Sequence, residues 1–250
     1  MKQFTANLQN ELFKLSRRKK YLVFFILACG VCQISALRGL VADRIWGEEL
    51  PASALLGGLI QSNLPILVLV FLPLAAILAS SDLFAGELSD HTLRFTLSRP
   101  VSKMSIFFSK ALAVFILCVV YLAGGVGLTL INQVAWGGGL QGILSGLVSA
   151  VLDLIPMAVL VLFFCFINQI VSGSGLTVLL SLVAYILLIV VGTYAPAAGG
   201  LLFTGYLRWH NLWVGTTLPF LSLLPRIGIL VGYGLVFACG GYLLFDRKNA

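Results

Sequence analysis

Long apolar runs separated by short polar segments constrain the fold of this chain more than any other feature of its 250 residues. Several of these runs approach or exceed the roughly 20 residues that a helix needs to cross a bilayer. Only 10% of the residues are charged, whereas a soluble domain carries about a quarter. We therefore expect an all-helical, polytopic membrane protein, with residues 1–250 forming a single transmembrane domain.

The apolar runs predict six transmembrane helices. The first run begins at Tyr21, has the length of a full span and lacks the small-residue pattern of a cleavage site, so it is interpreted as a retained span and not as a signal peptide. The predicted spans cover about residues 21–37, 55 or 64–80, 106–131, 147–167, 176–194 and 227–245.

Prolines and glycines predict local features of two spans. Pro65 and Pro73 are expected to kink the second span, because each lacks an N–H group and clashes with the preceding turn. Gly124, Gly125 and Gly127 are expected to let other helices approach the third span closely.

The distribution of basic residues predicts the topology. Twelve of the sixteen Lys and Arg residues lie before the first span, between the second and third spans or after the sixth, and four lie in the other segments. Because basic residues concentrate on the cytoplasmic side, both termini are expected in the cytoplasm of a bacterial-type cell with the chain in its inner membrane. The net charge of +7 is then a topology signal, and the lipid bilayer, not nucleic acid, is the expected partner.

An amphipathic helix is predicted within the N-terminal segment, residues 1–20. Phe4, Leu8, Leu12 and Leu15 fall on one stripe of a helix over residues 3–18. Such a helix lies in the headgroup plane, and the basic run that follows would contact anionic lipid. The alternative is a plain basic flank of the first span.

The longest polar stretch between two apolar runs is a predicted cytoplasmic loop, residues 82–105. Asp90 is expected to cap a short helix over residues 91–98, and Pro100 is expected to end it. Ser102 is expected to cap the helix that becomes the third span. This shape suits docking of a cytoplasmic partner, although an ordinary solvated connection is the alternative.

The sequence of this loop, GELSDHTLRFTLSRPVSK from Gly86 to Lys103, resembles the cytoplasmic loop of type-2 ATP-binding-cassette (ABC) permeases. That loop has an acidic residue, then Gly-Thr-Leu, then Leu-Ser-x-Pro-Val-Ser-Arg, and a Gly-Lys pair where the third span starts. His91, Lys103 and Ser109 depart from this pattern, replacing Gly, Arg and Gly. The matching residues are Glu87, Thr92, Leu93, Leu97, Ser98, Pro100, Val101, Ser102 and Lys110.

The resemblance implies half of a dimeric membrane domain that exports a substrate. Each half would dock a separate ATPase subunit through this loop, the coupling helix, and the second permease half would be an identical chain or a paralogue. ATP and Mg would be bound by the ATPase, because this chain has no G-x-x-x-x-G-K-[ST] phosphate loop. We therefore expect no enzyme activity and no cofactor in this chain. The residues expected to couple it to the ATPase are Glu87, Asp90, His91, Thr92, Leu93 and Arg94.

A substrate route is suggested by polar residues near the predicted outer ends of two spans. Asp153 is the one carboxylate predicted inside a span, where charges usually face a cavity or a partner. Gln61 and Asn63 would lie at a similar depth if the second span begins near residue 55. The alternative places Asp153 at the external water interface. The apolar spans favour a hydrophobic or amphipathic cargo, such as a peptide, toxin or drug.

Two other function classes fit less well. A stand-alone secondary transporter or channel needs ionisable residues deep in several spans, and only Asp153 qualifies. An intramembrane serine protease would need Ser174 beside His210, but the predicted topology separates them by about 30 Å of hydrocarbon. The aromatic segment 195–222 that contains His210 is expected to lie at the outer surface or to dip into it. The five cysteines have no metal-type spacing, so no metal site is predicted.

Overall fold

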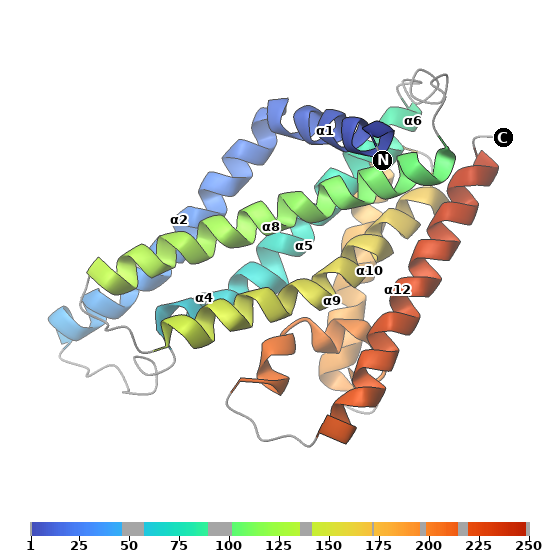
Figure 1. Cartoon of the computed structure of the whole chain (residues 1–250). Coiled ribbons are helices and arrows are strands. Elements are labelled where there is room, and N and C mark those ends of the chain that lie inside the picture. Colours follow the sequence, from blue (N-terminus) through green and yellow to red (C-terminus); the bar gives the residue numbers. More distant parts are fainter. Residues whose placement is uncertain are drawn as a thin grey trace.

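The computed structural model describes residues 2–46, 58–89, 102–135, 142–171, 173–195, 199–214 and 220–248, and every regular element in these ranges is helical. Figure 1 shows a bundle of long helices with the N-terminal helix lying against one end of it. Five described helical stretches are long and apolar enough to cross a membrane: Leu59–Gly86, Lys103–Ala135, Ile143–Ile170, Ser174–Tyr194 and Leu221–Arg247.

The elements follow one another in a simple order. The elements are α1 (Lys2–Arg17), α2 (Lys19–Trp46), α4 (Gly58–Ile66), η1 (Leu67–Phe71), α5 (Leu72–Ser80), η2 (Ser81–Gly86), α6 (Glu87–Ser89), α8 (Lys103–Ala135), α9 (Ile143–Ile170), α10 (Ser174–Tyr194), η3 (Phe203–Tyr206), η4 (Trp209–Leu212) and α12 (Phe220–Lys248). Of these, η1 and η2 are π-helical turns, and η3 and η4 are short 3-10 helices.

Helix α2 is longer than the first predicted span, which covers residues 21–37. The helix continues to Trp46, so the polar residues that follow the apolar run are helical and the helix extends beyond the predicted end of the span at residue 37. The five spans above do not include α2, and its role as a sixth span stays a prediction.

The second span is one continuous helix that contains two π-helical turns, η1 and η2. The first of these, η1, lies between Pro65 and Pro73. In a regular α-helix, the N–H of residue 73 would bond to the carbonyl of Leu69, but proline has no N–H. The hydroxyl of Tyr185, from α10, donates to that carbonyl at 2.7 Å instead. The helix continues through η2 and α6, so residues 82–89 of the predicted loop are helical.

Helix α8 begins as predicted. The backbone N–H of Ser105 donates to Ser102 Oγ at 3.3 Å, which confirms the N-cap. A Cβ added to Gly124 would lie 2.4 Å from the Phe25 ring, and one added to Gly125 would lie 2.8 Å from the Leu67 side chain, so both glycines permit close packing. Gly127 shows no such packing, because a Cβ added there would meet nothing within 4 Å among the residues that the structure describes.

Helix α9 is the centre of the bundle and packs against α4, α5, α8, α10 and α12. At the end of the bundle that holds α1, Asn168 Nδ2 donates to Ser80 Oγ at 3.0 Å. Near the opposite end, Gly146 packs against Ile60. The second span and α9 therefore run side by side in the same direction.

The segment over residues 199–214 lies between helices α9, α10 and α12. Phe203 is buried, and its ring centroid lies 5.3 Å from that of Phe163 on α9 and 5.5 Å from that of Phe237 on α12. Trp209 and His210 are buried as well. These three aromatic side chains of the segment thus belong to the packed interior, which explains part of its aromatic content.

Candidate functional site

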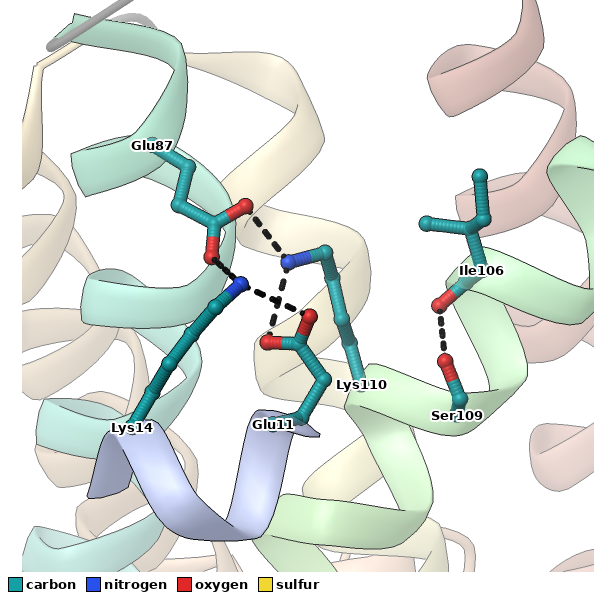
Figure 2. A network of polar contacts seen from close by, with 6 residues as sticks. All are labelled: Glu11, Lys14, Glu87, Ile106, Ser109 and Lys110. Atoms are coloured by element: carbon teal, nitrogen blue, oxygen red, sulfur yellow. Dashed lines mark hydrogen bonds and ion pairs between the residues drawn. The ribbon is translucent and has the colours of Figure 1, made fainter. Parts of the chain in front are cut away.

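Four charged side chains meet where α1 contacts α8 (Figure 2). Lys110 Nζ lies 2.7 Å from Glu87 Oε2 and 3.2 Å from Glu11 Oε2. Lys14 Nζ lies 2.8 Å from Glu87 Oε1 and 2.9 Å from Glu11 Oε1. Each lysine bridges both glutamates, so the two positive and two negative charges alternate around a closed ring. We call these four residues the ion-pair cluster.

Three separate parts of the chain supply the ion-pair cluster. Glu11 and Lys14 are three residues apart on α1 and therefore share one face of that helix. Glu87 is the first residue of α6, directly after the π-helical turn η2. Lys110 lies near the start of α8. The cluster therefore joins the N-terminal helix, the end of the second span and the beginning of the third.

Burial makes the pairing necessary. The side chain of Lys110 is completely buried, and those of Glu11 and Glu87 are only 3% and 9% exposed. A buried charge without a partner costs several kcal/mol, at about 3–5 kcal/mol when one member of a buried pair is removed. The four charges balance one another, so the ring stabilises only the arrangement in which α1, α6 and α8 are in contact.

The pairing changes the acidity of Glu87 and Lys14, which both lie outside the spans. Burial by itself would raise the pKa of the Glu87 carboxyl, but attraction to Lys110 and hydrogen bonds from Lys110 and Lys14 outweigh it and lower that pKa. Burial would likewise lower the pKa of Lys14, but its contacts with Glu87 and Glu11 raise it. Both groups are therefore held in their charged forms.

A second set of contacts joins the junction of α1 and α2 to the end of the second span. Asp82 accepts hydrogen bonds from Tyr21 Oη at 2.6 Å and from Lys20 Nζ at 2.7 Å, and Arg18 Nη1 lies 2.6 Å from the same carboxylate. Two members of the basic run thus pair with this carboxylate, while their side chains stay nearly half exposed.

The predicted coupling residues fall on both sides of the described boundary. Glu87 belongs to the ion-pair cluster, and its carboxylate contacts the two lysines. Asp90, His91, Thr92, Leu93 and Arg94 lie outside the described residues. Glu87 precedes that segment and Lys110 follows it, so the cluster ties together the two helices from which the segment extends.

The predicted substrate-route residues have different partners. Asp153 is buried on α9, where Oδ1 accepts from the backbone N–H of His210 at 2.9 Å and Oδ2 lies 2.7 Å from His210 Nδ1. Asn63 Nδ2 donates to Thr129 Oγ1 at 3.1 Å and to the Cys32 carbonyl at 3.3 Å. Gln61 is partly exposed. Asp153 and Asn63 are thus both inside the bundle, but their hydrogen bonds lead to different elements.

Sequence reasoning did not identify Glu11, Lys14 or His210 as members of polar contacts. One signal was present for Glu11: it is four residues from Leu15, so an acidic residue lies beside the apolar stripe of α1. Nothing local to His210 pointed to Asp153, which is 57 residues away in the chain.

Comparison with known proteins gave one family. The model described as "ABC-2 family transporter protein" matches residues 7–192, which include all four members of the ion-pair cluster and Asp153. No curated protein matches the chain.

Proposed function

Since the chain belongs to the ABC-2 family of transporter proteins, a family of membrane permeases, we propose that it couples ATP hydrolysis in a separate ATPase subunit to the export of a hydrophobic or amphipathic substrate. In this proposal, ATP and Mg bind to the partner chain. The permease works as a dimer, with α2 as a sixth span and both termini on the cytoplasmic side of a bacterial-type inner membrane.

The observation that carries the proposal is the ion-pair cluster, which joins Glu87 in the predicted cytoplasmic loop, residues 82–105, to Lys110, five residues after that loop. Glu87 lies just before residues 90–101, and Lys110 lies shortly after them. Because the buried charges cannot separate without a large cost in free energy, the helices that flank the segment move together. Force applied by an ATPase to the segment is then passed jointly to the second span, to α8 and to α1.

The predicted coupling residues have two roles in this proposal. Glu87 holds the base of the coupling segment through Lys14 and Lys110. Residues Asp90 to Arg94 form the surface that contacts the ATPase. The amphipathic helix α1 lies at the membrane interface beside the ATPase. Because α1 packs against α8, the two helices move together during transport.

Asp153 contributes to the export route by positioning a neighbouring segment. Both of its carboxylate oxygens contact His210, so we assign it the positioning of the segment over residues 199–214 and not direct contact with substrate. That segment then narrows the outer part of the route, together with polar side chains such as Gln61 and Asn63. The cargo class rests on the strongly apolar surface of the spans, and a peptide, toxin or drug fits it.

The test is purification of the tagged chain from its native membrane, with ATPase activity measured on the eluate. We expect a stoichiometric partner of about 25–35 kDa, the size of one domain. Leu93→Asp should abolish its retention, because a charge is placed on the expected docking surface. Leu201→Asp, at an exposed position in another segment, is the matched control and should retain the partner.

Two outcomes would contradict the proposal. Retention of the ATPase by Leu93→Asp would remove the coupling assignment. A wild-type chain that elutes alone and without ATP turnover would favour a stand-alone secondary transporter or channel, in which the buried Asp153–His210 pair would be the first site to examine.

A further inference from the structure

Helix α10 buries three of its side chains, and all three carry a hydroxyl group. They are Thr177, Ser181 and Tyr185, which follow one another at intervals of four residues and therefore share one face of the helix. Apolar side chains elsewhere on α10, such as Leu179 and Val183, are more than half exposed. The helix thus turns apolar surface outward, as suits a lipid environment, and a polar line inward.

This polar line faces the second span. Tyr185 Oη donates to the carbonyl of Leu69 at 2.7 Å, and Ser81 Oγ donates to the carbonyl of Ser174 at 2.9 Å. The contact positions rise along α10 as they fall along the second span, so the two helices are antiparallel. The stretch from Ser174 to Tyr185 covers about 16 Å of helix axis, so the contact extends from the end of the bundle near α1 towards its middle.

Helix α9 borders the same contact. Asn168 Nδ2 donates to Ser80 Oγ at 3.0 Å and to the carbonyl of Phe164 at 2.7 Å. The ring centroid of Phe164 lies 6.1 Å from that of Tyr185. The second span, α9 and α10 therefore enclose a line of uncharged polar side chains, each at most 7% exposed. We call this line the polar seam, and its members are Ser80, Ser81, Asn168, Thr177, Ser181 and Tyr185.

Two atoms in the polar seam have no hydrogen-bond partner among the residues that the structure describes, namely Asn168 Oδ1 and Ser181 Oγ. Both residues are at most 1% exposed. Thr177, one turn before Ser181, shows how a helix usually pairs such a group, since its hydroxyl donates to the carbonyl of Gly173 at 2.7 Å. A buried polar atom without a partner lowers stability, so the two atoms point to a bound molecule.

We propose that water enters the polar seam from the end near α1 and binds at Asn168 Oδ1 and Ser181 Oγ. Water fits both atoms, because an amide oxygen only accepts, a hydroxyl donates and accepts, and water can be either partner. The six members of the seam carry no charge, so the seam suits a neutral molecule and not an ion. Buried water commonly pairs such groups inside proteins, and ordered water also completes the bonding of spans that contain proline.

Bound water changes how α10 is held on the bundle. Helices in a membrane gain little from burying apolar surface against one another, because lipid is equally apolar, so hydrogen bonds between helices matter more. Water in the seam can replace the bonds of Ser81 and Tyr185 when α10 moves. The seam therefore lets α10 shift against the second span without leaving its polar groups unpaired.

The experiment is X-ray hydroxyl-radical footprinting of the detergent-solubilised full chain. The X-ray pulse produces radicals from water where the water lies, and mass spectrometry then identifies the oxidised side chains. Tyr185 is the reporter, since it lies one turn from Ser181. It should be oxidised faster than Tyr121, which is also buried but lies on α8, outside the seam. Ser181→Ala should reduce the oxidation of Tyr185 by about half, since it removes one of the two proposed water sites.

The matched control is Ser149→Ala. Ser149 is a buried serine on α9 whose hydroxyl donates to the carbonyl of Ser145 at 2.7 Å, so this variant removes a hydroxyl that already has a partner. It should leave the oxidation of Tyr185 unchanged.

The melting temperature is a second, independent measurement. Loss of a dry, unpaired hydroxyl raises the melting temperature, whereas loss of a hydroxyl that binds water leaves it unchanged or lowers it. Ser181→Ala should therefore give no increase.

Three results would overturn the proposal. These are oxidation of Tyr185 in the wild type that is as slow as that of Tyr121, oxidation of Tyr185 that does not change in Ser181→Ala, and a melting temperature that rises in Ser181→Ala. The measurements need neither an ATPase nor a substrate, so their failure is distinct from failure of the proposed transport function.

Discussion

Lys110 Nζ lies 2.7 Å from Glu87 Oε2, and the lysine side chain has no exposed surface. The two residues are 23 positions apart, at the two ends of the segment predicted to dock an ATPase. Their contact makes the end of the second span and the beginning of α8 mechanically continuous. The contacts of both residues with α1 extend this connection to the N-terminal helix.

Lys110→Met should destabilise the protein by about 3–5 kcal/mol, because it leaves the buried carboxylates of Glu11 and Glu87 with one lysine instead of two. The free energy of unfolding in mixed detergent micelles measures the effect. Glu11→Gln in the same chain should recover part of the loss, since it removes one of the two facing negative charges.

The control for this prediction is Lys103→Met. Lys103 Nζ lies 3.1 Å from Asp246 Oδ1, but both side chains are partly exposed, and exposed pairs contribute only about 0–1 kcal/mol. Equal effects of the two substitutions would show that burial does not strengthen the cluster.

The stability of the α1 contact should depend on pH at both extremes. The pKa of Glu87 is lowered in the folded protein, so its contribution is present above the ordinary glutamate value of 4.5 and is lost as the pH falls through the lowered value. The pKa of Lys14 is raised, so its contribution is present below 10.5 and is lost as the pH rises through the raised value. Thermal unfolding across this range should show a plateau with an acid and an alkaline edge. Glu87→Gln should weaken the acid edge, and an unchanged edge would refute this assignment.

Asp153→Ala should loosen the segment over residues 199–214. The substitution leaves the buried backbone N–H of His210 without its acceptor, at a cost of about 1–3 kcal/mol. Hydrogen exchange of the amides in η4 should accelerate, while exchange in α8 should not change. Asp246→Ala, which removes a partly exposed carboxylate, is the control and should leave η4 unaffected.

The more conservative Asp153→Asn addresses transport. It retains an oxygen that can accept the backbone bond but replaces the oxygen that faces His210 Nδ1. Export that proceeds at the wild-type rate, with assembly intact, would exclude Asp153 from any role in the route.

Gly124→Ala and Gly127→Ala should have different effects on stability, although the two positions are three residues apart on one helix. A Cβ at 124 would lie 2.4 Å from the ring of Phe25, so the contact of α8 with α2 must open and the melting temperature should fall. A Cβ at 127 would meet nothing within 4 Å in the described part of the chain, so alanine should be neutral or stabilising by up to about 1 kcal/mol through helix propensity. Equal melting temperatures for the two variants would contradict the close packing at Gly124.

Several parts of the fold and the site were predictable because they depend on neighbours in the sequence. The apolar runs identified the five spans from α4 to α12 to within several residues at most ends. Ser102 was recognised as a cap because an N-cap needs only a side-chain oxygen near the next turn. The end of α2 was not predictable in this way, because hydropathy marks only the end of the apolar run near residue 37, whereas the helix continues through polar residues to Trp46.

The sequence by itself determined the membrane class, the helical architecture and the resemblance to ABC permeases, because hydropathy, helix period and local motifs are properties of short stretches. Only the tertiary structure decided which polar groups meet. The pairing of Glu11 with Lys110 and of Asp153 with His210 joins residues 99 and 57 positions apart. Such pairs form because a charge buried between helices must find a partner, and the helix packing, which no local pattern specifies, determines which partner is within reach.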